Sequence, residues 1–473
     1  MSIQGAHLLS DPFFARLKAL VIDVTGMAFY ADKDGDLALI IADRMDHCAL
    51  ANCAGYLEHL AADPQEMEAL VAELTIGETY FFRHKEQFDA LREVVLPDIL
   101  ARNAASRRLR IWSAGCATGP EPYSLAILLK REFGARIAGW HVSILGTDIN
   151  QKFLSRAREG RYDQWAFRAT PDAIRNECFE ATGKQWQIKP EFKAMVSFQY
   201  HNLTRNRFPS IADNIAGLDI IICRNVVIYF SQPTIEAMVP CFYESLVEGG
   251  WLVMGHAEPN MDWFRRFRTI NYPGAVLYQR APADAVAPVA AVSRPPSCAP
   301  KAGPSTPAAV PVPRKSTLPP RPVPATGPRG HVENAPPPPS LPSAWTQLRG
   351  LADQGQWDAA LLACDKVLAD DGLNWRAHYL RALVLDQMGD DVGCEAGLRR
   401  AIYLERRAVL PHYHLGLFLA RHDDTEAARR SFRNALALLD NQPDDRLIDE
   451  GDDLSVGQMR ETVGMQMKLI GPS

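Results

Sequence analysis

The sequence predicts an α/β fold: a doubly wound, mainly parallel sheet with a helical domain before it and an all-α repeat domain after a long linker. Three observations predict this order. Apolar runs alternate with helical stretches between residues 86 and 281, prolines gather in 282–342, and aromatic residues recur at a fixed spacing after that. A chain of 473 residues is also too long for one compact core, so several domains are expected.

Residues 1–85 are expected to form a helical domain, because apolar residues such as Leu57, Leu60, Leu70 and Leu74 recur at helical spacing. This segment is acidic, with 13 aspartates and glutamates against six lysines and arginines. Either this segment does not dock on a partner as a basic surface would, or the partner's charge differs accordingly.

Short apolar runs predict the strands of a sheet within residues 86–281. Uninterrupted apolar runs suit strands that are buried on both faces, and helical stretches between them indicate a doubly wound parallel sheet. In such sheets ligands bind beyond the carboxyl ends of the strands. The runs are 109–115, 142–148, 195–200, 218–225 and 250–256.

Residues 282–342 contain 19 of the 34 prolines and divide the chain. Such a composition cannot bury enough apolar surface to fold, and proline keeps it extended. We interpret the segment as a linker, either a plain spacer or a polyproline segment that binds a partner.

Residues 343–473 repeat with a period of 34. Trp345, Tyr379 and Tyr413 form one column of the repeat, and Ala360, Cys394 and Ala428 form another. A third column holds Gly355 and Gly389, where Asp423 departs. A helix-turn-helix unit of this length is typical of tetratricopeptide repeats, which bind peptides or proteins. Three repeats and a capping helix near 453–469 are expected.

The composition excludes several classes of function. A net charge of −5 and a pI of about 6.2 disfavour a general nucleic-acid binder. No apolar run is long enough to span a membrane, and the N-terminus lacks the pattern of a secretion signal, so we expect a cytoplasmic protein. The nine cysteines are scattered, with Cys48 and Cys53 the closest pair, and predict neither disulfides nor a metal site.

Polar residues follow the predicted strands where a ligand would lie. Gly115 and Gly119 allow a tight turn after the first strand, and Glu121 then opens a helix, either as a dipole partner or as a ligand acceptor. Asp148 ends the second strand, where it either holds ribose hydroxyls or caps a helix. Asn202, Arg224, Asn225 and Tyr229 follow later strands. For Arg224 and Asn225 a ligand role is favoured over a surface ion pair, because these groups converge at one sheet edge.

These residues lie in motifs that resemble the CheR family of methyl-accepting chemotaxis protein methyltransferases. The motifs occur in the family's order: ETYFFR at 78–83, WSAGCATGPEPYS at 112–124, GTDI at 146–149 and CRNVVIYF at 223–230. The likeness extends to about Arg280. With its tetratricopeptide tail, the chain is similar to the subclass that includes WspC and FrzF, which serve chemosensory pathways.

The resemblance implies a class I methyltransferase domain at 86–281 with a small β-subdomain inserted near 160–190. It also implies S-adenosylmethionine (SAM) as cofactor, glutamate 5-O-methyl ester and S-adenosylhomocysteine as products, and the cytoplasmic domain of a methyl-accepting receptor as partner. It further implies a cytoplasmic enzyme that can be recruited to membrane receptor arrays. The pathway it serves would be chemotaxis or a related biofilm or motility pathway. By motif, the expected cofactor-binding residues are Thr79, Arg83, Gly115, Glu121, Asp148, Asn202, Leu203, Arg224 and Asn225, and the expected catalytic residues are Arg83, Arg224 and Tyr229.

Departures from the family's pattern refine these expectations. Gly77 replaces an asparagine that is frequent before the ETYFFR motif, so one contact to the cofactor is expected to be missing. The segment from Phe179 to Pro190 is short, which predicts action independent of a receptor's C-terminal pentapeptide. The alternative to an enzyme is a scaffold that senses SAM and binds partners through its repeats.

Overall fold

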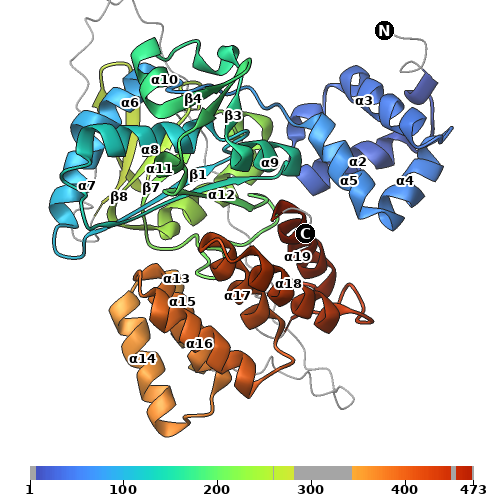
Figure 1. The fold of residues 1–473 in the computed structure, drawn as a ribbon. Helices are drawn as coiled ribbons and strands as arrows, with labels where there is room; N and C mark the ends of the chain where they lie inside the picture. Colours follow the sequence, from blue (N-terminus) through green and yellow to red (C-terminus); the bar gives the residue numbers. More distant parts are fainter. Residues whose placement is uncertain (1–6, 259, 261, 282–343, 449–453, 471–473) are drawn as a thin grey trace, which may run out of the picture. The chain divides into compact units, whose positions relative to one another are not determined.

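The computed structural model describes residues 7–258, 260, 262–281, 344–448 and 454–470. The predicted linker at 282–342 lies outside the described residues. At the centre of the first 281 residues is a seven-stranded sheet of order β6-β2-β1-β7-β8-β10-β9 (Figure 1). All of its strands run in one direction except β10, which pairs antiparallel with both of its neighbours, β8 and β9. The strands are β1 Arg108–Ala114, β2 His141–Asp148, β6 Val196–Tyr200, β7 Leu218–Cys223, β8 Leu246–Met254, β9 Phe267–Tyr272 and β10 Ala275–Arg280.

The five strands that the apolar runs predict are all present, and the C-terminal hairpin of β9 and β10 was missed. The hairpin lies at the edge of the sheet, where β9 is half exposed and alternates polar with apolar residues. A half-exposed edge strand has no continuous apolar run to detect.

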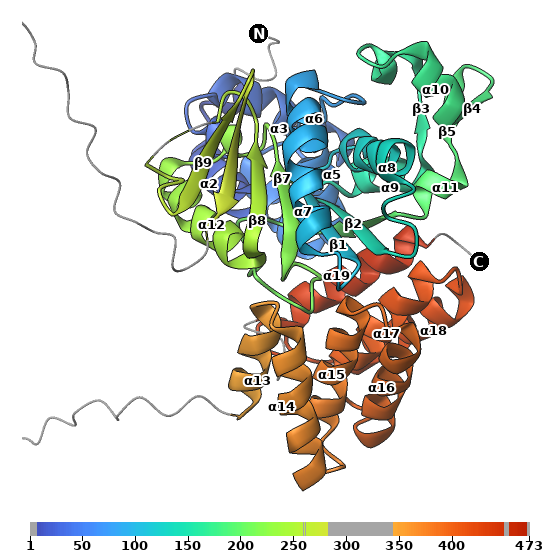
Figure 2. The ribbon, with the colours of Figure 1, turned by 90° about the vertical axis from the view of Figure 1, so that its left-hand side faces the viewer.

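The sheet is buried on both faces. One core cluster includes Ile111, Ile222 and Val253, which pack with α6 Lys85–Ala90, α7 Leu96–Arg102, α8 Pro120–Phe133 and α9 Gln151–Glu159. The other cluster includes Trp112 and Ile221, which pack with α12 Gln232–Ser245. Neighbouring residues of β1 thus point to opposite cores, as the alternation of side chains along a strand requires. Figure 2 shows α6 and α7 against the sheet.

A separate three-stranded antiparallel sheet of order β3-β5-β4 lies between β2 and β6 in the chain. It falls within the range where the resemblance implies an inserted β-subdomain. Two residues, Gly183 and Lys184, close the hairpin of β4 and β5, and Gly183 has a φ of 62°. The short segment noted in the sequence is therefore a tight hairpin. The strands are β3 Arg161–Tyr162, β4 Phe179–Thr182 and β5 Gln185–Ile188.

The N-terminal residues form the predicted helical domain around a core of their own. The helices are α2 Phe14–Thr25, α3 Asp34–His47, α4 Cys53–Ala62 and α5 Pro64–Leu74. Asn52 and Asp63 cap α4 and α5, each accepting a hydrogen bond from a backbone N–H of the first turn.

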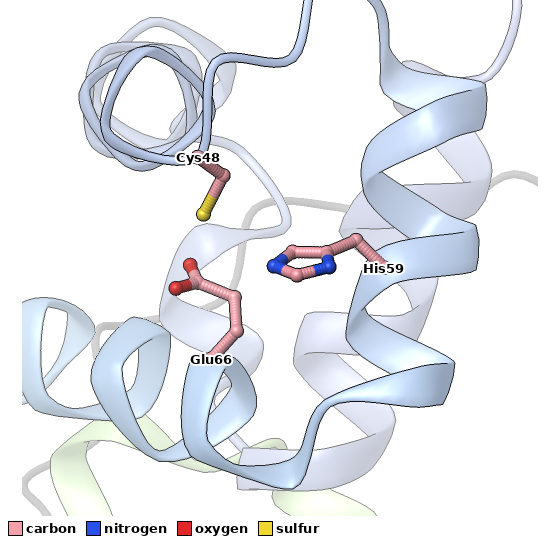
Figure 3. A group of neighbouring side chains, drawn as sticks. All are labelled: Cys48, His59 and Glu66. Carbon is pink, nitrogen blue, oxygen red and sulfur yellow. The ribbon is translucent and has the colours of Figure 1, made fainter.

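A buried ion pair crosses this domain. Glu66 is 6% exposed, and its carboxylate accepts hydrogen bonds from Arg44 and from the hydroxyl of Tyr56 at 2.7 Å. Burial opposes the ionisation of Glu66, but these hydrogen bonds outweigh it and lower its pKa. Cys48, His59 and Glu66 place metal-type ligand atoms within 4.8 Å of one another (Figure 3). Both oxygens of Glu66 are already occupied by Arg44 and Tyr56, so the geometry favours an internal ion pair over a cation site.

The C-terminal residues form three helical hairpins and a final helix, as the 34-residue period predicts, and Figure 2 shows the hairpins side by side. Ala360, Cys394 and Ala428 are at most 1% exposed, which fits small residues at the helix crossings. The helices are α13 Ala344–Asp353, α14 Trp357–Asp370, α15 Trp375–Gln387, α16 Asp391–Leu404, α17 Val409–Arg421, α18 Thr425–Leu439 and α19 Val456–Leu469.

The turn column of the repeat keeps its backbone conformation where its sequence changes. Gly355 and Gly389 both have a φ of 73°, and Asp423 in the third repeat has a φ of 60°. Aspartate tolerates the left-handed region better than most residues. The departure at Asp423 is therefore compatible with the same turn. Among the described helices, none is both long and apolar enough to cross a membrane.

We predict that Glu66→Ala lowers the local free energy of unfolding of α3–α5 by about 3–5 kcal/mol, because it leaves the Arg44 guanidinium buried without its partner. Hydrogen exchange of these helices in the full chain measures this loss. Lys18→Ala is the control, because its pair with Asp34 is half exposed, and we expect a change below about 1 kcal/mol. Equal effects of the two substitutions would contradict the assignment.

Candidate active site

A cavity of about 350 Å³ lies at the carboxyl ends of β1, β2 and β7. It has the size of a small-molecule site and occupies the position where doubly wound sheets bind ligands. All of the residues expected to bind the cofactor or to take part in catalysis line it: Thr79, Arg83, Gly115, Glu121, Asp148, Asn202, Leu203, Arg224, Asn225 and Tyr229. Thr25 and Met27 of the N-terminal domain line it as well.

The turn after β1 requires glycine at two positions. Gly115 has a φ of 76°, and a Cβ there would lie 2.4 Å from the side chain of Val226. Gly119 has a φ of 93°, and a Cβ there would lie 2.8 Å from Ala157. Both positions lie in the left-handed region, and the added atoms would also clash. The turn can therefore approach the cavity closely only with these glycines.

Glu121 and Arg224 form a buried ion pair beside the cavity. The Nε of Arg224 donates to Glu121 at 2.6 Å, and the other carboxylate oxygen of Glu121 accepts from the hydroxyl of Ser113 at 2.6 Å. Each residue is 8% exposed. Glu121 therefore has partners beyond the dipole of its helix, and Arg224 is in a buried rather than a surface ion pair.

The guanidinium of Arg224 also reaches two groups outside the strands. Its Nη1 donates to the backbone carbonyl of Arg83 at 2.6 Å and to the amide oxygen of Gln87 at 2.9 Å. Gln87 in turn donates to the carbonyl of Met254 at 2.6 Å. Arg224 thus fixes the segment that carries Arg83 against the ends of β7 and β8.

Asp148 faces the cavity at the end of β2. One carboxylate oxygen accepts from the backbone N–H of Ala117 at 2.9 Å, and the other accepts from that of Asn150 at 2.8 Å. The N-cap of α9 is Asn150, not Asp148, because the side chain of Asn150 accepts from Phe153. Burial raises the pKa of Asp148 to about 6, against the opposing effect of its backbone donors.

Asn225 turns the chain after β7 and presents an unpartnered acceptor. Its φ is 59°, and its buried Oδ1 has no hydrogen-bond partner within the described residues. Buried acceptors are rarely left unpaired, so this oxygen is suited to a donor group on a ligand.

Glu258 holds this turn from behind. It is 3% exposed, and its carboxylate accepts from the backbone N–H groups of Asn225 at 3.1 Å, Val226 at 2.9 Å and Gly255 at 2.6 Å. Burial raises its pKa, and the backbone donors partly offset this effect. Glu258 was not predicted from the sequence, although this residue follows the last predicted strand at the same edge of the sheet.

Arg83, Asn202 and Tyr229 complete the polar lining. Arg83 donates through Nη1 to the carbonyl of Glu78 at 2.6 Å, whereas its buried Nε has no partner in the described part of the chain. The amide of Asn202 donates to the carbonyl of Val24 at 2.8 Å, so it ties the cavity wall to the N-terminal domain. The ring of Tyr229 packs edge-on against Phe29 at 5.6 Å, and burial raises its pKa.

Gly77 is explained by its neighbour. A Cβ at this position would lie 2.4 Å from the ring of Phe153, which itself lines the cavity. The aromatic ring thus fills the space where the related sequences often have a side chain at the position of Gly77. Nothing in the spacing of the α9 residues marked Phe153 as part of the site.

Known proteins match this chain over the same segments. The model of the CheR methyltransferase SAM-binding domain matches residues 77–273. The probable biofilm formation methyltransferase WspC of Pseudomonas putida is 30% identical over 384 residues, which cover 79% of this chain and 86% of that protein. The chain belongs to the CheR methyltransferase family.

Other relatives agree with this membership. The probable biofilm formation methyltransferase WspC of Pseudomonas aeruginosa is 29% identical over 396 residues, which cover 82% of this chain and 90% of that protein. The chemotaxis protein methyltransferase of Listeria monocytogenes is 34% identical over 203 residues, or 43% of this chain and 73% of that protein. The predicted class I methyltransferase fold and the predicted methyl donor, SAM, are thereby confirmed.

The cavity of this CheR-family methyltransferase fits that donor. SAM carries an ammonium group and hydroxyls that need acceptors, and a carboxylate that needs donors. The unpartnered Oδ1 of Asn225 and the carboxylate of Asp148 are such acceptors, and the unpartnered Nε of Arg83 is such a donor. The turn at Gly115 packs closely on Val226 in the same cavity wall, so no side chain fits at residue 115. We therefore expect these residues to hold the cofactor.

We predict that the affinity for the cofactor decreases as the pH falls below about 6. The ionised carboxylate of Asp148 is the better acceptor for hydroxyls, and its pKa of about 6 means that it becomes protonated in that range. Calorimetric titration with S-adenosylhomocysteine should show a loss of up to about tenfold per pH unit below the pKa and a plateau above it. Asp148→Asn should bind more weakly with a flatter profile. A wild-type profile without this decrease would refute the role of Asp148.

We further predict that Glu258→Ala weakens S-adenosylhomocysteine binding by at least about tenfold, because several buried N–H groups lose their acceptor. Glu258→Gln keeps one carbonyl oxygen and should lose less. Glu244→Ala removes an exposed carboxylate paired with Arg266 and serves as the control, with an affinity within about twofold of the wild type. Thermal unfolding of each variant separates lost binding from lost folding. Unchanged affinity in folded Glu258→Ala would contradict the role of Glu258.

Proposed function

We propose that this CheR-family enzyme esterifies glutamate side chains of a methyl-accepting receptor in a chemosensory pathway. Relatives named as chemotaxis and biofilm formation methyltransferases support this substrate class. The observation that supports it most is the state of the two cavity arginines. Arg224 is engaged by Glu121, Gln87 and a backbone carbonyl, whereas Arg83 keeps a buried Nε without a partner among the described residues.

A glutamate acceptor needs little chemical activation. SAM supplies a methyl group that is already electrophilic because it is bonded to a sulfonium. A glutamate is ionised at neutral pH, so its oxygen can react without a general base. The task of the protein is then to align the acceptor carboxylate and to exclude water. Arg83 would orient that carboxylate by charge, and Arg224 would position Glu121 and the Arg83 segment.

The role of Tyr229 follows from its place in the cavity. It lines the same wall as Asn225, and its packing against Phe29 fixes the ring. We assign it to shaping the cavity beside the transferred methyl group. The short β4–β5 hairpin supports the proposal that no receptor pentapeptide is needed.

The reaction is tested with the full chain, SAM labelled in its methyl group and receptor cytoplasmic domains. We expect label in the receptor that base releases as methanol, because carboxyl methyl esters are base-labile. Replacing the methylated glutamates by alanine should abolish it. Label that resists base would identify another acceptor group and overturn the proposal. Cofactor binding with no transfer would instead indicate the SAM-sensing scaffold.

We predict that Arg83→Ala lowers kcat with the receptor by about 10–100-fold, because the acceptor carboxylate loses its orienting charge. Arg83→Lys should restore part of the rate. The affinity for S-adenosylhomocysteine, measured in parallel, separates the two roles of Arg83: a loss of affinity alone, with kcat unchanged, would leave it a cofactor residue only.

Independence of the pentapeptide has its own test. Receptor domains with and without a C-terminal pentapeptide should be methylated at equal rates. Measurable binding of the isolated pentapeptide to the full chain would contradict this part of the proposal.

A further inference from the structure

The repeat domain contains a groove of about 790 Å³ that the methyl-transfer site does not explain. It is lined by α16 and α18, the second helices of the second and third repeats, and by one face of α17. His412, Leu415 and Leu419 supply that face at spacings of three and four residues, so they share one side of the helix. They are at most 8% exposed and form the floor of the groove.

The rim of the groove differs in chemistry from its floor. Arg399, Arg406 and Arg430 are exposed side chains that line it, and among its described lining residues none is acidic. Arg399 forms an ion pair with Glu395 on its own helix, so its charge is partly neutralised. Arg406 and Arg430 are the other two positive charges on the rim. Arg406 follows α16 at the end of the second repeat, and Arg430 lies on α18 of the third repeat. The two arginines therefore flank the floor around Leu415 and Leu419.

An exposed aromatic residue adds apolar surface at the same rim. Tyr403 is 66% exposed and lines the groove together with Ile402. Large exposed apolar side chains next to a groove mark surfaces that bind partners. An apolar floor with a basic rim matches an amphipathic segment whose polar face is acidic, as in helices that bind with their apolar side in a groove.

We propose that this groove binds an acidic, amphipathic peptide segment of a partner protein. The apolar side chains of the segment lie on the floor around Leu415 and Leu419, and its carboxylates pair with Arg406 and Arg430. This binding goes beyond methyl transfer and needs neither SAM nor a methylated residue. The repeats then select a partner by charge, separately from the choice of the methylated glutamate.

The test uses the full chain and a fluorescent synthetic peptide with glutamates on one helical face and leucines on the other. Fluorescence anisotropy should show binding that weakens as salt rises, because the rim charges are exposed. The double variant Arg406→Ala/Arg430→Ala should bind at least about tenfold more weakly. Arg433→Ala is the matched control, since Arg433 is exposed on α18 but does not line the groove, and it should bind within about twofold of the wild type.

Further probes separate charge from apolar contact. The same peptide with glutamine at every glutamate should lose most of its affinity, and Tyr403→Ala should weaken binding of the acidic peptide without unfolding the repeats. The proposal is overturned if the double variant binds as tightly as the wild type or if the glutamine peptide binds as well as the acidic one. Single-stranded RNA that binds more tightly and displaces the peptide would also overturn it. Methyl transfer is not the readout, so these results stand apart from those of the receptor assay.

Discussion

The buried ion pair of Glu121 and Arg224 connects the parts of this enzyme that must be in register for methyl transfer. Glu121 belongs to the first turn of α8, and Arg224 directly follows β7. Through Ser113, Gln87 and the carbonyl of Arg83, the pair also contacts β1, α6 and the segment before α6. Two charges removed from water are stable only when their remaining hydrogen-bonding groups are satisfied, and these contacts supply the required partners.

A second buried carboxylate serves the same turn by different means. The carboxylate of Glu258 accepts hydrogen bonds from backbone N–H groups of the turn and of Gly255, where Glu121 accepts from a guanidinium. This arrangement supports the left-handed conformation of Asn225, which an isolated chain would rarely adopt. The unpartnered oxygen of Asn225 is thus a consequence of a fixed turn. The backbone N–H groups are bonded to Glu258, and the side-chain oxygen in the cavity wall has no partner among the described residues.

The sequence predicts the sheet and the cavity well because both depend on local patterns. Buried parallel strands are continuous apolar runs, which can be recognised in the sequence. Because the carboxyl ends of such strands meet at one edge of the sheet, the sequence predicts that residues as far apart as Gly115 and Asn225 lie at the same site. The edge strand β9 has no such pattern, because half of its residues are exposed and polar residues interrupt its apolar ones. Glu258 and Phe153 were missed because their roles depend on contacts with Asn225 and Gly77 across the fold, which no spacing along the chain reveals.

Binding of the methyl donor and selection of the methyl acceptor can depend on different parts of the protein. The groups that face the cavity follow the strand ends and are fixed by buried contacts, so a change there alters the whole cavity. Arg83 lies on a connecting segment. Its side chain donates one hydrogen bond to Glu78 and lies over the Tyr80 ring, its carbonyl accepts from Arg224, and its Nε has no partner among the described residues. Surfaces on the helical domain, the β4–β5 hairpin and the repeats can vary without disturbing those buried contacts. The choice of acceptor can thereby change while the methyl donor stays the same.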